Sequence, residues 1–172
     1  HPMYHNKKQF SRNSIYNYYK TAGNDGYKQV KAYNKSVQFP HLCENIFRFE
    51  IRTQQAKFIN SLGLYTMNDL IEFKNYDVLI NSLLKEWDNV LLFDLSKDID
   101  IKFFNTYFWE EAIMAKNRNR FCLQKALYQK KLGVNNLHSN IREIIDRKTK
   151  YLKCVHIPTI TKMETAQVKI LF

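Results

Sequence analysis

A chain of 172 residues, of which 45% are hydrophobic and 15% aromatic, is long enough to bury a hydrophobic core of its own. Lys and Arg outnumber Asp and Glu by 27 to 16, and the net charge of +11 is spread along the chain. This excess favours a polyanionic partner, nucleic acid before a ribosomal or membrane surface, and apolar runs fall short of the ~18 residues that a membrane-spanning helix needs.

Two segments rich in Tyr, Ile and Val come first in the chain, at residues 14–20 and 27–35. Between them lies TAGNDG, in which Gly, Asn and Asp favour a tight turn. We therefore expect these segments to pair as a β-hairpin.

The segment from Asn45 to Thr53, NIFRFEIRT, alternates between apolar and charged residues. Such a period of two predicts a strand with one buried and one solvated face. The apolar face would carry Phe47, Phe49 and Ile51, and the charged face Arg48, Glu50 and Arg52.

Helical spacing follows this strand. A first short helix is expected to end at Gly63, and Thr66 with Asp69 three residues later fits the N-cap of a second one. Apolar residues between Asp77 and Phe93 recur at i, i+3, i+4 and i+7, which predicts an amphipathic helix packed on the core.

The C-terminal half reads as helical and basic. Residues 106–132 are rich in Lys and Arg, Gly133 offers a stop, and Asn135 or Asn136 would cap a last helix through Tyr151. The helix, glycine, helix order also fits a helix-turn-helix, although any pair of connected helices shows it.

Together these elements predict an α+β fold. A small antiparallel sheet, made of the hairpin and the Asn45–Thr53 strand, would be covered on its apolar face by helices and followed by a mostly helical C-terminal part. We divide the chain into residues 1–75, which hold the sheet, and residues 76–172, which form a helical, basic region.

Cysteine usage and the first residues indicate a compartment. Cys43, Cys122 and Cys154 are odd in number and widely spaced, so reduced thiols are expected. The first residues are polar and form no secretory leader. Both features predict a cytoplasmic protein.

Tyr33 is the tyrosine whose neighbours suggest chemistry. Lys31 and Lys35 lie two residues to either side and therefore on the same face of a strand. Two ammonium groups beside a phenol favour its ionised form and can hold a phosphate. A packing tyrosine on a basic surface is the alternative.

Other chemistry finds little support. His1 and His5 are four apart, but Pro2 stands between them at what reads as a ragged terminus, so we name no metal site. The chain has neither a glycine-rich phosphate loop nor a serine in a nucleophile motif.

Two short motifs occur in an order that resembles a known protein family. RFE lies on a strand that leads into a helix and an LGL...DL step, and a Tyr-x-Lys strand precedes it. This arrangement resembles the filamentous-phage replication initiators, the gene II/X protein family, and related phage and plasmid rolling-circle replication proteins. The resemblance is best over residues 14–73 and rests on Tyr33, Lys35, Arg48, Phe49, Glu50, Leu62, Gly63, Leu64, Asp69 and Leu70.

The resemblance implies a tyrosine-dependent endonuclease that nicks one strand of origin DNA, stays attached to the 5′ phosphate and rejoins the ends. Tyr33 would be the nucleophile, and Lys35 would orient the phenol or stabilise phosphate charge. Arg48 and Glu50 would border this surface, with a structural ion pair as the preferred role of Glu50. The implied partner is origin DNA, single- and double-stranded, and the implied cofactor is Mg²⁺ or Mn²⁺.

One feature departs from the family. Such enzymes hold their metal through a strand of the form His-hydrophobic-His upstream of the tyrosine, and HPMYH has a different spacing. Either the ligands precede His1, so that residues 1–75 are a partial endonuclease-like domain, or the protein binds DNA without cutting it. We favour the former.

Three functional hypotheses follow: a nicking initiator, a non-catalytic DNA-binding module of a replication protein that uses the basic helices, and a basic interaction protein that never meets DNA. The residues expected to contact DNA are Lys31, Arg48, Arg52, Lys116, Arg118, Arg120 and Lys125.

Overall fold

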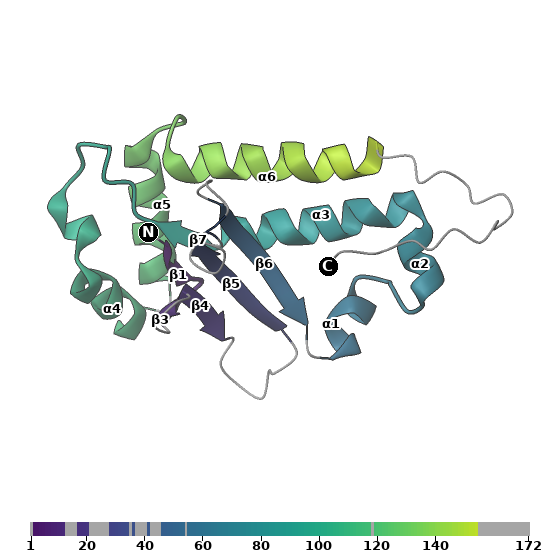
Figure 1. Ribbon diagram of the computed structural model, residues 1–172. Coiled ribbons are helices and arrows are strands. Elements are labelled where there is room, and N and C mark those ends of the chain that lie inside the picture. Colours follow the sequence, from purple (N-terminus) through teal and green to yellow (C-terminus); the bar gives the residue numbers. More distant parts are fainter. Residues whose placement is uncertain are drawn as a thin grey trace, which may run out of the picture.

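The computed structural model describes residues 2–12, 17–20, 28–34, 36, 41, 46–53, 55–117 and 119–154. Within them, two antiparallel sheets and several helices form the α+β fold that the sequence predicts (Figure 1). The strands are β1 (Pro2–His5), β2 (Lys8–Gln9), β3 (Ser11–Arg12), β4 (Asn17–Lys20), β5 (Lys28–Asn34), β6 (Phe47–Thr53) and β7 (Val90–Leu92). The helices are α1 (Ala56–Ser61), α2 (Met67–Ile71), α3 (Phe73–Asp88), the 3-10 helix η2 (Ile101–Phe104), α4 (Thr106–Met114), α5 (Arg120–Leu132) and α6 (Leu137–Cys154).

The larger sheet has the order β3-β4-β5-β6, with every neighbouring pair antiparallel. Pairing of β4 with β5 confirms the predicted hairpin, whose turn lies outside the described residues. Strand β6 confirms the third predicted strand. In its register with β5, Ala32 lies opposite Phe49 and Tyr33 lies opposite Arg48.

The smaller sheet, of order β2-β1-β7, corrects two expectations. The helix predicted to reach Phe93 ends at Asp88, and residues 90–92 form β7. The first residues, read as a ragged terminus, form β1 and pair with β7. β7 is an edge strand of this sheet, yet all three of its residues are buried. Periodicity alone does not distinguish such a short apolar run from the end of a buried helix.

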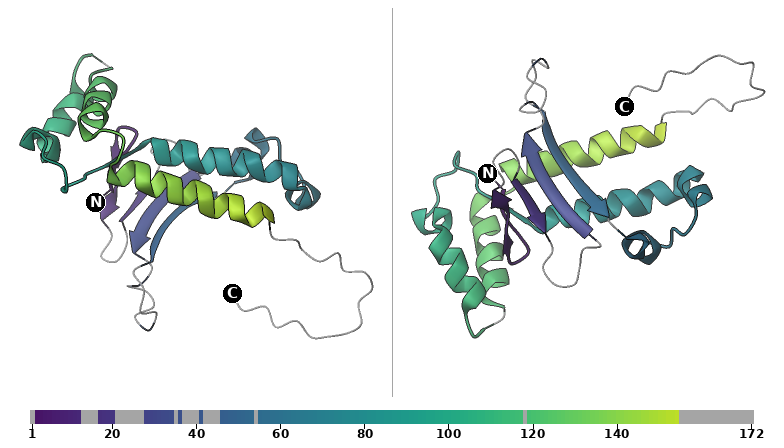
Figure 2. Two further views of the ribbon diagram at one scale, coloured as in Figure 1. Left: turned by 90° about the horizontal axis from the view of Figure 1, so that it is seen from above. Right: turned by 60° about the horizontal axis from the view of Figure 1, so that its bottom comes forward.

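Helices α3 and α6 run side by side across the apolar face of the larger sheet (Figure 2). Trp87 of α3 is fully buried there. The centroid of its ring lies 5.1 Å from the ring centroid of Phe49, and the ring stacks on that of His138 with a centroid distance of 5.1 Å. The cluster around Trp87 also contains Phe10, Val30, Ala32, Val90 and Leu92.

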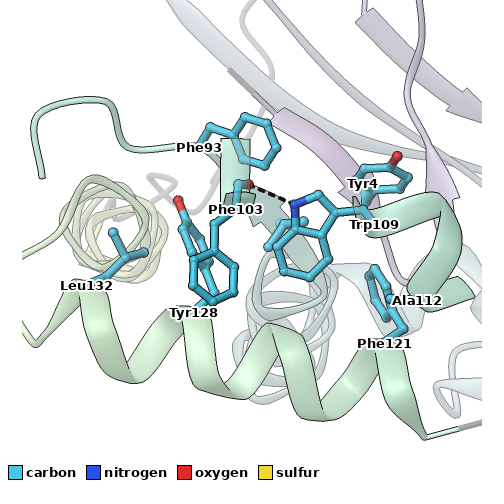
Figure 3. Packing of buried hydrophobic residues seen from close by; sticks show 9 residues of the cluster. Tyr4, Phe93, Phe103, Trp109, Ala112, Phe121, Tyr128 and Leu132 are labelled. Atoms are coloured by element: carbon cyan, nitrogen blue, oxygen red, sulfur yellow. Dashed lines mark hydrogen bonds between the residues drawn. The ribbon is translucent and has the colours of Figure 1, made fainter. Parts of the chain in front are cut away.

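A second cluster joins β1 and β7 to η2, α4 and α5 (Figure 3). Trp109 is fully buried and donates from Nε1 to the carbonyl oxygen of Phe103 at 2.8 Å. The Tyr128 hydroxyl donates to the carbonyl of Leu92 at 3.0 Å and accepts from the Asp94 amide at 3.1 Å. Both clusters combine residues from the two regions into which we divided the sequence.

Local signals at the helix ends behave as predicted. Thr66 and Asp69 form a capping box at α2, and Gly63 takes a positive φ of 80° just after α1. Asn136 caps α6, because its Oδ1 accepts from the amide of Ser139 at 2.9 Å. The basic segment predicted over residues 106–132 is divided between α4 and α5.

Candidate nucleic-acid interface on the larger sheet

The candidate site follows from the pleat of β5 and β6. Val30 and Ala32 of β5 point toward α3 and are buried, so Lys31 and Tyr33 between them point to the opposite side. Antiparallel pairing brings the charged residues of β6 to that same side. We call this surface the polar face, and it consists of Lys31, Tyr33, Arg48, Glu50 and Arg52.

Glu50 stands at the centre of the polar face. The Tyr33 hydroxyl donates to Oε2 of Glu50 at 3.2 Å. Nζ of Lys31 lies 3.7 Å from Oε1 of Glu50, and Nη1 of Arg48 lies 4.0 Å from Oε2. The carboxylate of Glu50 therefore lies within 4.0 Å of a phenol and of two cationic groups.

The ion pairs on this face are loose. The Glu50 side chain is 33% exposed and that of Arg48 48%, so water screens their attraction. Arg52 is also exposed, and among the described residues no carboxylate pairs with it. Such cations add little to stability and stay available to an anionic ligand.

The polar face unites several residues singled out in the sequence and adds one contact. Lys31, Tyr33, Arg48 and Arg52 share it, and the ion pair expected of Glu50 is present. The hydrogen bond from Tyr33 to Glu50 was not foreseen, because it depends on the register between the two strands. Lys35 and Arg118 lie outside the described residues.

The candidate residues of the helical region lie elsewhere. Lys116 and Arg120 are exposed where α4 leads into α5, and these helices form one end of the molecule, away from β6 (Figures 1 and 2). Lys125 is half-buried, and its Nζ donates to the carbonyl oxygen of Asp88 at 2.8 Å. The predicted DNA contacts therefore fall on two separate surfaces.

The helix-turn-helix order is present in α5 and α6, but the start of α6 is tied to the core. The amide of Leu137 donates to Oδ2 of Asp94 at 2.8 Å. The imidazole of the next residue, His138, stacks on Trp87. A recognition helix presents its first turns to a DNA groove, so this packing does not favour groove reading by α6.

A buried ionic cluster lies beneath the opposite face of β5. Glu86 of α3 accepts from Lys28 at 2.7 Å and lies 2.8 Å from Nε2 of His5. Burial opposes ionisation of Glu86, but hydrogen bonds from His5 and Lys28 outweigh it and hold the pKa of this carboxyl below its usual value. The cluster links β1, β5 and α3, and no sequence signal marked it.

Metal chemistry does not fit the donors in this part of the chain. Over the described residues, no group of three or more His, Cys, Asp or Glu side chains converges. Among the described residues, His5 and Glu86 form a His–carboxylate contact, but the ammonium group of Lys28 binds the same carboxylate and would repel a metal cation. The Mg²⁺ or Mn²⁺ that the resemblance implies therefore has no ligand set among these residues.

Comparison with protein-family models, with curated protein sequences and with solved structures found no match. Within the described part of the chain, no helix combines the length and the apolar character that crossing a membrane requires. What the polar face can do chemically is bind phosphate groups through its cations and place a phenol beside a carboxylate base.

Proposed function

We propose that this protein is a DNA-replication initiator of the rolling-circle type, which nicks and rejoins a single strand of origin DNA. In this proposal the polar face binds the DNA backbone and Tyr33 is the nucleophile. The observation that carries the proposal is the 3.2 Å hydrogen bond from the Tyr33 hydroxyl to Glu50, with Lys31 and Arg48 beside the same carboxylate.

Groups on the polar face can supply the nucleophile and the proton acceptor that the nicking step needs. The phenolic oxygen of Tyr33 forms a bond to phosphorus as the bond from phosphorus to the 3′ oxygen breaks, which leaves a 5′-phosphotyrosine and a free 3′ hydroxyl. Glu50 lies within reach to accept the phenolic proton, and that proton passes to the departing 3′ oxygen. Rejoining is the reverse transfer.

Charge on the phosphate is the second requirement. Lys31 and Arg48 lie beside Glu50, and Arg52 lies on the same face of the sheet. Three cations and one carboxylate give the face a net positive charge that attracts the DNA backbone. A bound divalent ion would neutralise the scissile phosphate further. We assign no ligands for that ion and route no step through it.

Formation of a covalent adduct tests the catalytic proposal. The probe is a pool of 3′-labelled single-stranded oligonucleotides of random sequence, incubated with the protein and Mn²⁺ or Mg²⁺, and an adduct is seen as label that migrates with denatured protein. In a chain extended upstream of His1 to include the metal ligands that the resemblance implies, we expect an adduct with the unaltered sequence and with Tyr107→Phe, a control at an exposed tyrosine of α4, but none with Tyr33→Phe.

Two results would contradict the proposal. An adduct that persists in Tyr33→Phe removes Tyr33 from the nucleophile role, and the lack of any adduct with the extended chain removes nicking. Glu50→Gln should slow adduct formation without changing the residue that is modified, because it removes the base and keeps the hydrogen-bond acceptor.

A second candidate is a non-catalytic DNA-binding module. The observation that favours it is that the cations of the polar face are only loosely paired, with Lys31 3.7 Å and Arg48 4.0 Å from Glu50, and can bind phosphates without any chemical step. Such a module would bind single-stranded DNA with an affinity that falls steeply with salt, as counterion release requires. Full affinity in Tyr33→Phe together with no adduct in the extended chain would select it.

A further inference from the structure

A pocket of about 520 Å³ lies where the β1–β2 turn, the α3–β7 turn and α5 meet. The two turns are held together by the amide of Asn6, which donates to the carbonyl of Asn89 at 3.0 Å. Helix α5 forms the remaining wall with Cys122, Lys125 and Ala126 among its residues. None of these elements belongs to the polar face.

The lining chemistry suits an anion with a partly apolar body. Lysines approach from two elements, Lys7 from the β1–β2 turn and Lys125 from α5, and no acidic residue is among the described residues that line the pocket. The residues that line the pocket also include Asn6, Asn89 and Gln129, whose side chains carry amides. Cationic groups bind phosphate oxygens, and amides pair with the edges of heterocyclic bases.

Lys125 is the most informative of these residues. Its side chain is half-buried, and this burial lowers its pKa. An ammonium group has three donors, and among the described residues the carbonyl oxygen of Asp88 is the one acceptor that Lys125 contacts. The Asp88 carboxylate is itself engaged by Arg142 at 2.6 Å and 3.2 Å. A bound anion would compensate the partial desolvation of Lys125 and take the place of water at its other donors.

A purely structural role for Lys125 also has to be considered. Asp88 is the last residue of α3, and a lysine that donates to a terminal carbonyl stabilises the end of a helix. That role accounts for one donor and for the direction of the side chain. It does not account for a second lysine and three amides around a pocket of ligand size.

We propose that this pocket binds a nucleotide. The phosphate lies at the ammonium groups of Lys125 and Lys7, and the base lies against the wall formed by Cys122 and Ala126, within reach of the amides. The ligand is a free mononucleotide or one nucleotide unit of a DNA strand. The proposal does not rest on the function proposed for the polar face, because the two sites share no residue.

Cys122 offers a direct readout, because it is exposed and lines the pocket. In a Cys43→Ser, Cys154→Ser background, the rate at which iodoacetamide alkylates Cys122 is measured with increasing dAMP or dTMP. A 5′-phosphorylated oligonucleotide forms a parallel arm that distinguishes a strand from a free nucleotide. Deoxyadenosine and inorganic phosphate are tested as partial ligands, and isothermal titration calorimetry of the unaltered chain gives the affinity.

We expect nucleotides, free or in the strand, to protect Cys122, and Lys125→Gln to weaken this protection roughly tenfold to a hundredfold. Lys125→Arg should retain most of it. Lys130→Gln, at an exposed lysine of the same helix that does not line the pocket, should retain it fully. Thermal unfolding of each variant reports whether the fold is kept, and the Arg variant keeps the test decisive if Lys125→Gln unfolds.

Several outcomes would overturn the proposal. No protection by millimolar nucleotide would exclude the site, and full protection in Lys125→Gln would leave this residue as a helix cap only. Inorganic phosphate that binds as tightly as dAMP would refute recognition of a nucleotide. Deoxyadenosine that protects as well as dAMP would refute the phosphate role of the lysines.

Discussion

Strand β5 has a covered side, which faces α3, and the polar face on the other side, and on each a carboxylate is contacted by basic side chains. On the covered side, Glu86 is buried and is contacted at 2.7 Å by Lys28 and at 2.8 Å by His5. On the polar face, Glu50 is one-third exposed, and its cations lie 3.7 Å and 4.0 Å away. Similar residues thus form a tight, dry cluster on one side and a loose, wet one on the other.

This difference separates a structural role from a functional one. A buried carboxylate that loses its partners leaves uncompensated charge, so the covered cluster holds β1, β5 and α3 together. An exposed pair adds little to stability, so the arrangement on the polar face is free to serve binding or catalysis.

The largest expected effect on stability is that of Glu86→Gln. The variant leaves Lys28 without a countercharge and His5 without its carboxylate partner in a buried site, and we expect a loss of about 3 kcal/mol in the free energy of unfolding. The matched change Glu50→Gln should cost less than about 1 kcal/mol. Urea unfolding followed by circular dichroism gives both values. Equal losses would contradict the claim that Glu86 contributes more to stability than Glu50.

A smaller contrast is expected between two tyrosines. Tyr128→Phe removes a hydroxyl that bonds the Asp94 amide and the Leu92 carbonyl in a buried site, at a cost of about 1–3 kcal/mol. Tyr33→Phe acts on the polar face and should change the free energy of unfolding by about 0.5 kcal/mol or less. A destabilisation by Tyr33→Phe as large as that by Tyr128→Phe would show that the phenol of Tyr33 is structural.

The smallest expected effect is a pH dependence of stability that arises at His138, which stacks on Trp87 of α3. Burial lowers the pKa of His138 below its ordinary value of 6.5, so the unfolded chain binds its proton more readily. The stability contributed by the neutral imidazole is present above pH 6.5 and is lost as the pH falls through the folded-state pKa. Unfolding midpoints between pH 7.5 and 5.0 should therefore decline less in His138→Gln than in the unaltered chain, and an equal decline would contradict this assignment.

Local features of the fold could be predicted from the sequence. The turn residues between β4 and β5, the alternation along β6 and the capping box at Thr66 and Asp69 each depend on neighbours within a few residues. For the same reason, the shared face of Lys31 and Tyr33 followed from the pleat of one strand.

Features that depend on distant segments could not be predicted. Nothing near Glu86 indicates His5, which is 81 residues away, and an acidic residue on an amphipathic helix reads as solvated. The sequence predicts that residues 90–92 continue the helix, because their partner strand β1 lies at the start of the chain, far away in sequence. The contact of Tyr33 with Glu50 required the register of β5 and β6.

The most direct test of the polar face is DNA binding by an Arg48→Gln, Arg52→Gln double variant. A Lys85→Gln, Lys148→Gln double variant serves as the control, because both lysines are exposed on α3 and α6, which cover the opposite side of the sheet. Binding of a labelled single-stranded oligonucleotide is measured by fluorescence anisotropy over a range of salt concentrations.

We expect the arginine variant to lose affinity and to lower the slope of log K against log salt by roughly 1.4, that is, two phosphate contacts at roughly 0.7 each, whereas the lysine control keeps the slope of the unaltered chain. An unchanged slope in the arginine variant, or an equal loss in the lysine control, would contradict a DNA-binding role for the polar face.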